Sequence, residues 1–403
     1  MEEAIQDWKV ELRGLARSVE QRIRRELGSL QGMLDRDRDP YHIAPYRGYG
    51  RAGRVLVLGR VLQNERLLPA DPRHSKVFNL LAMIKRLESD PLPLARVRAK
   101  LPGGDRELVA DDEGFIRAWL ELKFEATGWN AVPLELAHPE HHAPIVKAPV
   151  LTPLLSSSYG VISDMDDTVL QSEVTNFIRA AGMVLLENAR TRLPFAGVAA
   201  FYRALEQGSS GIAGNPIFYV SSSPWNLYDV IADFLEAQEI PIGPVLLRDW
   251  DLRPSLLRNM AHKTQLIADI LNTFTSMPFI LIGDSTQEDP EIYTEIVSAH
   301  PGRILAVYIR NVRPHPERSA VVQELARRVA QTGSALVLAD DTLTIASHAA
   351  AHGWIRAEAL PSIRQEKQAD EGDGSKAPAP GVKLSEPTPT VVVDPDVDTS
   401  DLE

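Results

Sequence analysis

The apolar positions near the start of the chain recur at helical spacing. Between Trp8 and Met33 they fall at steps of three or four residues, as one face of an α-helix requires. Arginines occupy much of the opposite face. Such a face is either solvated while the helix packs on its own domain, or it rests on anionic lipid headgroups. We predict an amphipathic helix within residues 1–39 and leave both roles open.

Short apolar runs broken by turn residues follow over residues 40–150. Turn-forming residues at Pro102–Gly104 and Asp111–Gly114 separate the later runs. Short strands between such turns are typical of an antiparallel sheet or sandwich, so we predict a β-rich, sandwich-like domain here. The clearest runs are Arg54–Val61, Ala95–Lys100 and Gly114–Leu122.

From Tyr159 onward, short apolar runs alternate with longer helical patterns. This alternation predicts an α/β domain over residues 151–360, with βαβ units around a mostly parallel sheet. Ligands of such sheets bind beyond the carboxyl ends of the strands. The predicted strands are Tyr159–Ser163, Ile217–Ser221, Pro244–Leu247, Phe279–Gly283 and Ile304–Ile309. The predicted helices are Gly197–Glu206, Pro224–Glu236, Lys263–Thr273 and Glu317–Ala330.

Residues 366–403 are rich in proline and acidic residues and poor in aromatic ones. They hold ten Asp or Glu against three Lys, so they carry −7 of the net charge of −12. A segment of this composition cannot bury a core, and we predict a disordered acidic tail.

The overall charge and composition exclude several classes of protein. A net charge of −12 disfavours nucleic acid as a partner. With no cysteine, the chain has no disulfide framework, no thiolate nucleophile and no cysteine-ligated metal. The first residues do not resemble a signal peptide, and no run approaches the roughly 20 apolar residues of a membrane span. We therefore expect a soluble, cytoplasmic protein.

The strongest chemical signal is the sequence SDMDDT at residues 163–168, directly after a predicted strand. Three carboxylates within four positions repel one another unless they share a cation or a proton. With oxygen ligands and a phosphate substrate, the expected cation is Mg²⁺. The alternative is an acidic surface turn, but such turns rarely follow a buried strand directly.

Three further segments fit the same chemistry. Ser221 and Ser222 end a predicted strand, and the helix after them can hold an anion with its first amides, although Ser-Pro is also a common helix cap. Lys263 would add positive charge beside a phosphoryl group, although an isolated lysine is more often a surface residue. Asp284, followed by Asp289, forms a second acidic strand end. Two acidic ends in one parallel sheet can converge on a single metal.

Taken in order, these motifs resemble the haloacid dehalogenase superfamily. The matching residues are Asp164-x-Asp166-x-Thr168, Ser221, Lys263 and Gly283-Asp284 with Asp289. The resemblance implies a Rossmann-like fold in which Asp164 attacks phosphorus and forms an aspartyl-phosphate. It also implies that Asp166 protonates the leaving oxygen and then deprotonates the attacking water.

The same resemblance assigns the binding residues. Thr168, Ser221, Ser222 and Lys263 would hold the phosphoryl oxygens. Mg²⁺ would be bound by the Asp164 carboxylate, the Asp166 backbone carbonyl and Asp284, with Asp289 supporting these ligands from behind.

A closer resemblance is to the actin-patch-associated phosphatidate phosphatase catalytic-domain family, particularly its bacterial-type members. It spans about Leu151–Ile355 and rests on ISDMDDTV, on YVSSSPWN at Tyr219–Asn226 and on IGDSTQEDPEIY at Ile282–Tyr293. PYRGYG at Pro45–Gly50 also resembles the β domain that precedes the catalytic domain in bacterial members. The resemblance implies Mg²⁺-dependent hydrolysis of phosphatidate to diacylglycerol and phosphate, with peripheral contact to a membrane.

Two other functions remain open at this stage. The motifs hold phosphate and metal but do not reach acyl chains, so the substrate could be a soluble phosphomonoester or a phosphoprotein. The third possible function is that of a non-catalytic adaptor that binds lipid or protein. The intact set of catalytic aspartates disfavours it.

Overall fold

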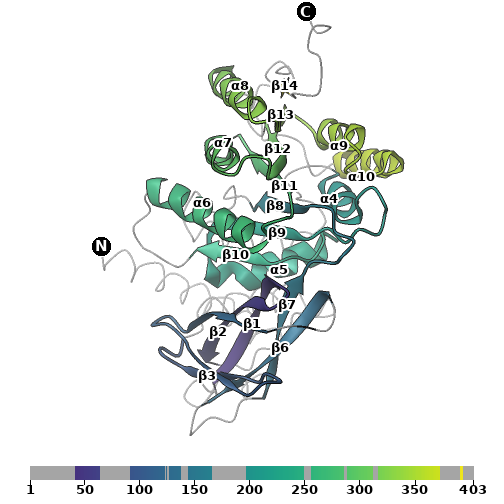
Figure 1. The fold of residues 1–403 in the computed structure, drawn as a ribbon. Helices are drawn as coiled ribbons and strands as arrows, with labels where there is room; N and C mark the ends of the chain where they lie inside the picture. The colour runs from purple at the N-terminus through teal and green to yellow at the C-terminus, as the bar shows by residue number, and fades with distance from the viewer. Residues whose placement is uncertain are drawn as a thin grey trace, which may run out of the picture. The chain divides into compact units, whose positions relative to one another are not determined.

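The computed structural model describes residues 41–63, 91–122, 124, 127–137, 144–165, 197–248, 256–285, 288–311, 316–372 and 391–393. The amphipathic helix predicted within residues 1–39 lies outside these ranges. The chain divides into two compact units, each built around a seven-stranded sheet (Figure 1). Among the described residues, unit 1 comprises those up to Thr152 and Ser223–Asp233, and unit 2 comprises the rest.

Unit 1 contains the β-rich domain that the sequence predicts. Its sheet has the strand order β4-β3-β6-β7-β1-β2-β5, and neighbouring strands are antiparallel except for the parallel pair β1–β7. The strands are β1 (Tyr41–Arg51), β2 (Arg54–Gln63), β3 (Arg96–Ala99), β4 (Arg106–Val109), β5 (Phe115–Leu120), β6 (Gly128–Leu136) and β7 (Val146–Thr152).

The seven strands of unit 1 form one continuous hydrogen-bonded sheet and not two separate sheets, as a sandwich would have. Alternate residues of every strand contribute to a single core, for example Val55 and Val57 on β2 and Val132 and Leu134 on β6. The sequence pattern did not predict β1, because its residues YHIAPYRGYGR form no continuous apolar run.

Unit 2 is an α/β unit whose sheet has the strand order β10-β9-β8-β11-β12-β13-β14. The pairs β9–β8, β8–β11, β11–β12 and β12–β13 are parallel, whereas β14 is antiparallel to β13. All five strands predicted after Tyr159 are present within one to three residues of their expected ends. The strands are β8 (Gly160–Asp164), β9 (Ile217–Pro224), β10 (Val245–Arg248), β11 (Phe279–Asp284), β12 (Ile304–Arg310), β13 (Ala335–Ala339) and β14 (Val391–Val393).

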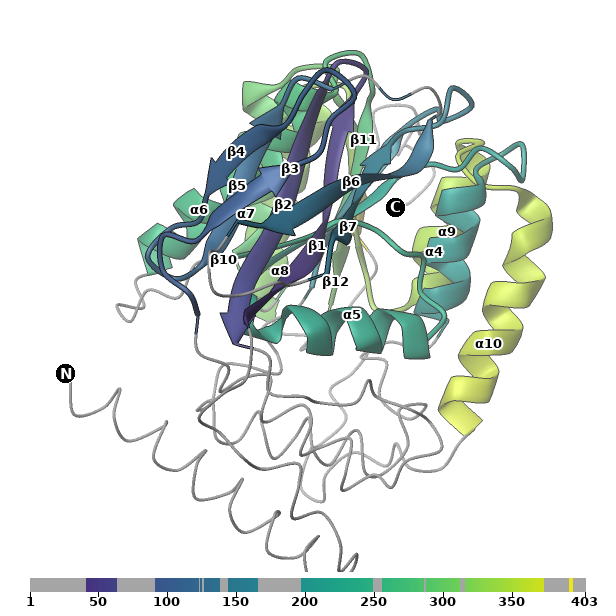
Figure 2. The same cartoon turned by 90° about the horizontal axis from the view of Figure 1, so that it is seen from below.

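Helices cover both faces of this sheet. In Figure 1, α6, α7 and α8 lie on one face and α4, α9 and α10 on the other. Figure 2 shows α4, α9 and α10 side by side. Among the described helices, none is long and apolar enough to span a membrane. The helices are α4 (Val198–Gln207), α5 (Tyr228–Ala237), α6 (Leu256–Thr273), α7 (Asp289–Ala299), α8 (Pro316–Ala330), α9 (Thr342–Ala351) and α10 (Leu360–Gly372), with short 3₁₀ segments at Trp225–Leu227 and Ala357–Ala359.

The first residues of two helices differ from those that the sequence predicts. The helix expected to open at Lys263 begins at Leu256, so Lys263 lies in the interior of α6. The stretch from Leu256 to His262 contains no glycine or proline, and nothing in it stops the helix from extending that far. The helix expected from Pro224 instead begins with a 3₁₀ turn at Trp225, because β9 continues to Pro224.

The range predicted as a disordered tail, 366–403, contains two regular elements. Helix α10 continues to Gly372, and Val391–Val393 form β14 at the edge of the sheet. Composition alone did not show that Glu366 and Asp370 accept hydrogen bonds from α4, or that three consecutive valines suit an edge strand.

The carboxyl end of α6 is closed by the side chain of Arg303. Its Nη2 atom lies 3.2 Å from the carbonyl oxygen of Leu271, 2.6 Å from that of Phe274 and 2.9 Å from that of Met277. The last carbonyls of a helix have no partner within the helix, so a positively charged donor there satisfies several acceptors at once.

We predict that Arg303→Gln lowers the free energy of unfolding by about 1 to 3 kcal/mol, because these carbonyls lose a charged donor. Arg327→Gln is the matched control, since it removes an exposed ion pair with Glu324 and should change stability by less than about 0.5 kcal/mol. Urea unfolding of both variants measures this. Equal losses in the two variants would contradict the capping role of Arg303.

Candidate active site

Two acidic residues end neighbouring parallel strands of unit 2. Asp164 is the last residue of β8, and Asp284 is the last residue of β11. The register pairs Ser163 with Ile282, so both strands finish at the same edge of the sheet. The two acidic strand ends therefore lie together, and the single metal that the sequence predicts between them stays a prediction.

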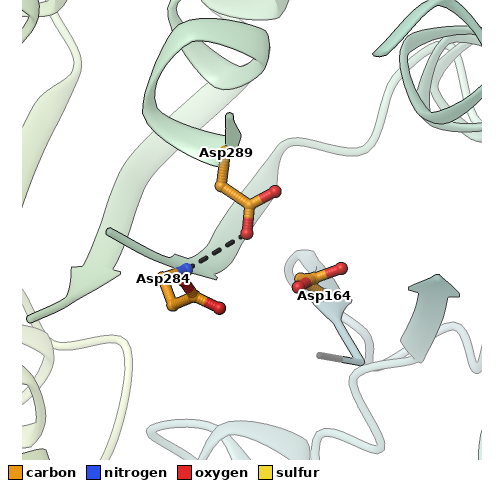
Figure 3. A group of neighbouring side chains, drawn as sticks. All are labelled: Asp164, Asp284 and Asp289. Carbon is orange, nitrogen blue, oxygen red and sulfur yellow. Dashed lines mark hydrogen bonds between the residues drawn. The ribbon is translucent and has the colours of Figure 1, made fainter. Parts of the chain in front are cut away.

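A third carboxylate joins them from the first residue of α7. Oxygen atoms of Asp164, Asp284 and Asp289 all lie within 4.8 Å of one another, and Figure 3 shows the three side chains facing a common space. Asp284 and Asp289 are 3% and 0% exposed, and the side chain of Asp164 is 4% exposed. We call these three residues the carboxylate cluster.

Asp289 is held by groups behind the cluster. Its Oδ2 atom accepts a hydrogen bond of 3.1 Å from the backbone N–H of Asp284, drawn as the dashed line in Figure 3. Its Oδ1 atom pairs with Lys263. Gly283 leaves room for this carboxylate, because a Cβ atom at Gly283 would lie 2.3 Å from Oδ2. With both oxygens engaged, Asp289 is placed to orient the site.

Lys263 brings a positive charge into the cluster from α6. Its ammonium lies 2.6 Å from Oδ1 of Asp164 and also pairs with Asp289. The side chain is 3% exposed, so the surface role that an isolated lysine suggests does not apply. Burial by itself lowers the pKa of Lys263, but the carboxylates of Asp164 and Asp289 outweigh it and raise the pKa above its ordinary value. The ammonium therefore stays charged at neutral pH.

The predicted phosphate-binding serines lie beside the end of β8. Residue Val220 of β9 pairs with Asp164 of β8, and the backbone N–H of Met165 donates to the carbonyl of Val220 at 3.0 Å. Ser221, which is buried, and Ser222, which is half-buried, follow at once at the same edge. Asp166 and Thr168 lie outside the described residues, so their predicted roles stay predictions.

Sequence reasoning missed two residues near the cluster. Tyr202 of α4 lies 2.7 Å from the hydroxyl of Ser163, next to Asp164, but its position on an apolar helix face gave no signal. Arg310 ends β12 opposite Asp284, is 7% exposed, and donates to Thr342 Oγ1 at 3.0 Å. A charged residue at the end of an apolar strand was the available signal for Arg310.

The donor set of the cluster fits a hard divalent cation. All of its side-chain donors are carboxylate oxygens, the ligand type that Mg²⁺ prefers. Burial raises the pKa of Asp289, and Lys263 offsets part of that rise. With these three carboxylates ionised, the ammonium of Lys263 leaves two negative charges among the described residues of the cluster, which a divalent cation would balance.

Comparison with known proteins finds similarity over the range that contains this site. Residues 159–311 match the family model described as "Phosphatidate phosphatase APP1, catalytic domain". "Phosphatidate phosphatase APP1" of Saccharomyces cerevisiae is 33% identical over 154 residues, which are 38% of this chain and 25% of the yeast protein. "Uncharacterized protein C29B5.04c" of Schizosaccharomyces pombe is 25% identical over 248 residues, 58% of this chain and 40% of that protein.

The chain thus spans at most 40% of the length of these two relatives. A solved structure, that of XAC1771, described as a carbohydrate acetylesterase from Xanthomonas citri, aligns with a TM-score of 0.24. It is 12% identical and covers 73% of this chain and 75% of its own, and so low a score carries no argument about the fold. The matched range contains the carboxylate cluster, Ser221 and Lys263, so the candidate site lies where this chain is similar to the catalytic domain of phosphatidate phosphatase APP1.

Proposed function

We propose that this protein is a metal-dependent phosphatidate phosphatase that works through an aspartyl-phosphate in a haloacid dehalogenase-type site. The observation that carries the proposal is the buried carboxylate cluster with Lys263, at the carboxyl edge of a parallel sheet and inside the family-matched range. Ligand sites of open α/β sheets lie at this edge. The name of the yeast relative supplies the substrate class.

The residues divide the reaction between them. The carboxylate of Asp164 attacks phosphorus, and the diacylglycerol oxygen leaves with a proton from Asp166. Asp166 then takes a proton from water, whose oxygen attacks phosphorus and frees phosphate and the Asp164 carboxylate. Lys263, Ser221, Ser222 and Thr168 hold the phosphoryl oxygens.

A cation completes the charge balance of this reaction. Mg²⁺ held by Asp164, the Asp166 carbonyl and Asp284 would supply the positive charge that stabilises the phosphoryl oxygens. Lys263 has a second task beside Asp164, because its ammonium, 2.6 Å from Oδ1, holds that carboxylate in one orientation.

A soluble phosphomonoester is the alternative substrate. Every side chain of the carboxylate cluster, Lys263 and the serines is polar, so these residues recognise a phosphate and make no contact suited to acyl chains. If phosphatidate is the substrate, a cytoplasmic protein must bind peripherally to the membrane that contains this lipid.

The test compares the two substrate classes directly. Phosphate release is measured from phosphatidate in detergent micelles and from glycerol 3-phosphate, each with Mg²⁺ and with EDTA. We expect release from phosphatidate with Mg²⁺ and none with EDTA. Release only from the soluble substrate would replace the proposed substrate, and no release from either would contradict a phosphatase.

We predict that Asp164→Asn lowers turnover by at least about 10³-fold, because an amide is a far weaker nucleophile. Asp269→Asn is the control, since this aspartate lies on α6 outside the cluster and contacts Gln265. Its turnover should match that of the wild-type enzyme. Steady-state phosphate release is measured for both variants. Turnover of Asp164→Asn equal to that of the wild-type enzyme would exclude Asp164 as the nucleophile.

Asp166→Asn should reduce turnover by about 10² to 10⁴-fold, the usual contribution of a positioned acid or base. Its backbone carbonyl is unchanged, so the Mg²⁺ concentration for half-maximal activity should stay near the wild-type value. The Mg²⁺ dependence of turnover measures both quantities. Unchanged turnover would show that another group moves the proton.

Gly283→Ala should lower kcat/KM at least about tenfold, because the new methyl group displaces the Asp289 carboxylate that orients Lys263 and the backbone of Asp284. Gly103→Ala is a matched control, because a Cβ atom there meets nothing within 4 Å. Kinetics of both variants provide the measurement. Equal kcat/KM in the two variants would mean that Asp289 has no part in orienting the site.

A further inference from the structure

We propose that Tyr202 is a positioning residue for Asp164 and acts on it through Ser163. This inference rests on the proposed function, because it assigns a further residue to the same reaction. Tyr202 lies on α4, outside all the motifs that the sequence analysis identified.

Two hydrogen bonds connect Tyr202 to the nucleophile. The Ser163 hydroxyl donates to the backbone carbonyl of Asp164 at 3.0 Å, and the Tyr202 hydroxyl lies 2.7 Å from the same Ser163 oxygen. A serine hydroxyl has one hydrogen, so when Ser163 donates to the carbonyl it accepts from Tyr202. The chain of donors therefore runs from Tyr202 to Ser163 to the carbonyl of Asp164.

The hydroxyl of Tyr202, the first donor of this chain, keeps its proton at neutral pH. Burial raises the pKa of Tyr202, and its hydrogen bond with Ser163 offsets only part of that rise. Ser163 and Tyr202 are 1% and 8% exposed, which leaves little access for water as a competing partner. The two hydroxyls are therefore shielded from competing water.

The ring of Tyr202 is held by its aromatic neighbours. It stacks on Tyr219 with ring centres 6.5 Å apart and an interplanar angle of 21°, and meets Phe201 at 6.2 Å and 63°. Tyr219 belongs to β9 and is tied by its own hydroxyl to the carbonyl of Pro241 at 2.7 Å. The phenol thus packs on the strand that carries Ser221.

Helix α10 fixes the helix on which Tyr202 stands. The backbone N–H groups of Gly197 and Ala200, at the start of α4, each donate at 2.8 Å, to Asp370 and Glu366 respectively. Glu366 also pairs with Arg203 at 2.5 Å. These amides have no partner within the helix, so the two carboxylates cap α4, which lies beside α10 in Figure 2.

Close packing reinforces this cap. Gly197 has a φ of 78°, and a Cβ atom there would lie 2.9 Å from the carbonyl oxygen of Ile363 on α10. The start of α4 therefore approaches α10 as closely as a residue without a side chain permits. Tyr202 is one turn and a half further along the same helix.

This network acts on the main chain from which the nucleophile projects. A carboxylate must point at phosphorus within a narrow range of angles, and a shift of a fraction of an ångström in its backbone reduces the rate. Tyr202 hydrogen-bonds to Ser163 and is proposed to act on the reaction only through that residue. Its effect should therefore fall on kcat and spare KM.

Tyr202→Phe tests this, since it removes only the hydroxyl. Tyr159→Phe is the matched control, because it removes another buried hydroxyl of unit 2, one that donates to the carbonyl of Leu205 at 2.9 Å. With Mg²⁺ and phosphatidate in detergent micelles, we expect kcat of Tyr202→Phe to fall about tenfold at unchanged KM. The control should keep at least about half of the wild-type kcat, and circular dichroism checks that both variants are folded.

Ser163→Ala extends the test to the middle of the chain. Because the two hydroxyls act as one unit, the double variant Ser163→Ala/Tyr202→Phe should be no slower than Ser163→Ala alone. Wild-type kcat in Tyr202→Phe, an equal loss in Tyr159→Phe, or multiplication of the two losses would each overturn the inference. An inactive wild-type enzyme would instead overturn the proposed function, and the inference with it.

Discussion

The ion pairs of Lys263 are the interaction on which this site depends. Three buried carboxylates at one sheet edge would repel one another, and each would be costly to ionise away from water. One ammonium, placed between Asp164 and Asp289, offsets that repulsion before any cation binds. The interior position of Lys263 on α6 follows from this need, since its whole stem is buried to deliver the charge.

The surrounding elements keep the charged groups in place. Asp289 opens α7, where the helix dipole favours a carboxylate, and the backbone of Asp284 donates to it. Arg318 of α8 donates to the carbonyl of Ser285 at 2.9 Å and also binds Glu291 on α7. The turn between β11 and α7 is therefore held from both sides. Fixed dipoles and charges of this kind need little reorganisation during a reaction.

Much of the fold followed from local patterns in the sequence. Buried strands such as β8 and β11 are short apolar runs, and the carboxyl ends of neighbouring parallel strands must share an edge, so Asp164 and Asp284 could be expected to meet. β13 was not predicted, because Ala335–Ala339 is short and rich in alanine and leucine, which suit a helix equally.

Other features depend on contacts that no local pattern records. Lysine is usually exposed, and only the folded chain shows that Lys263 is buried between two carboxylates. Glu366 and Asp370 looked like part of an acidic tail, because composition counts their charges and not the amides of α4 that they cap. Tyr202 gave no signal in the sequence, because its contact with Ser163 exists only in the folded chain.

In the mechanism that we propose, Asp164 becomes phosphorylated during turnover. The direct measurement is mass spectrometry of the enzyme after it is mixed with phosphatidate and Mg²⁺ and quenched in acid within the first turnovers. We expect a transient phosphoryl group on the peptide that contains Asp164, which disappears once the substrate is consumed. A phosphoryl group on another residue, or continued turnover with no labelled Asp164 at any time, would contradict it.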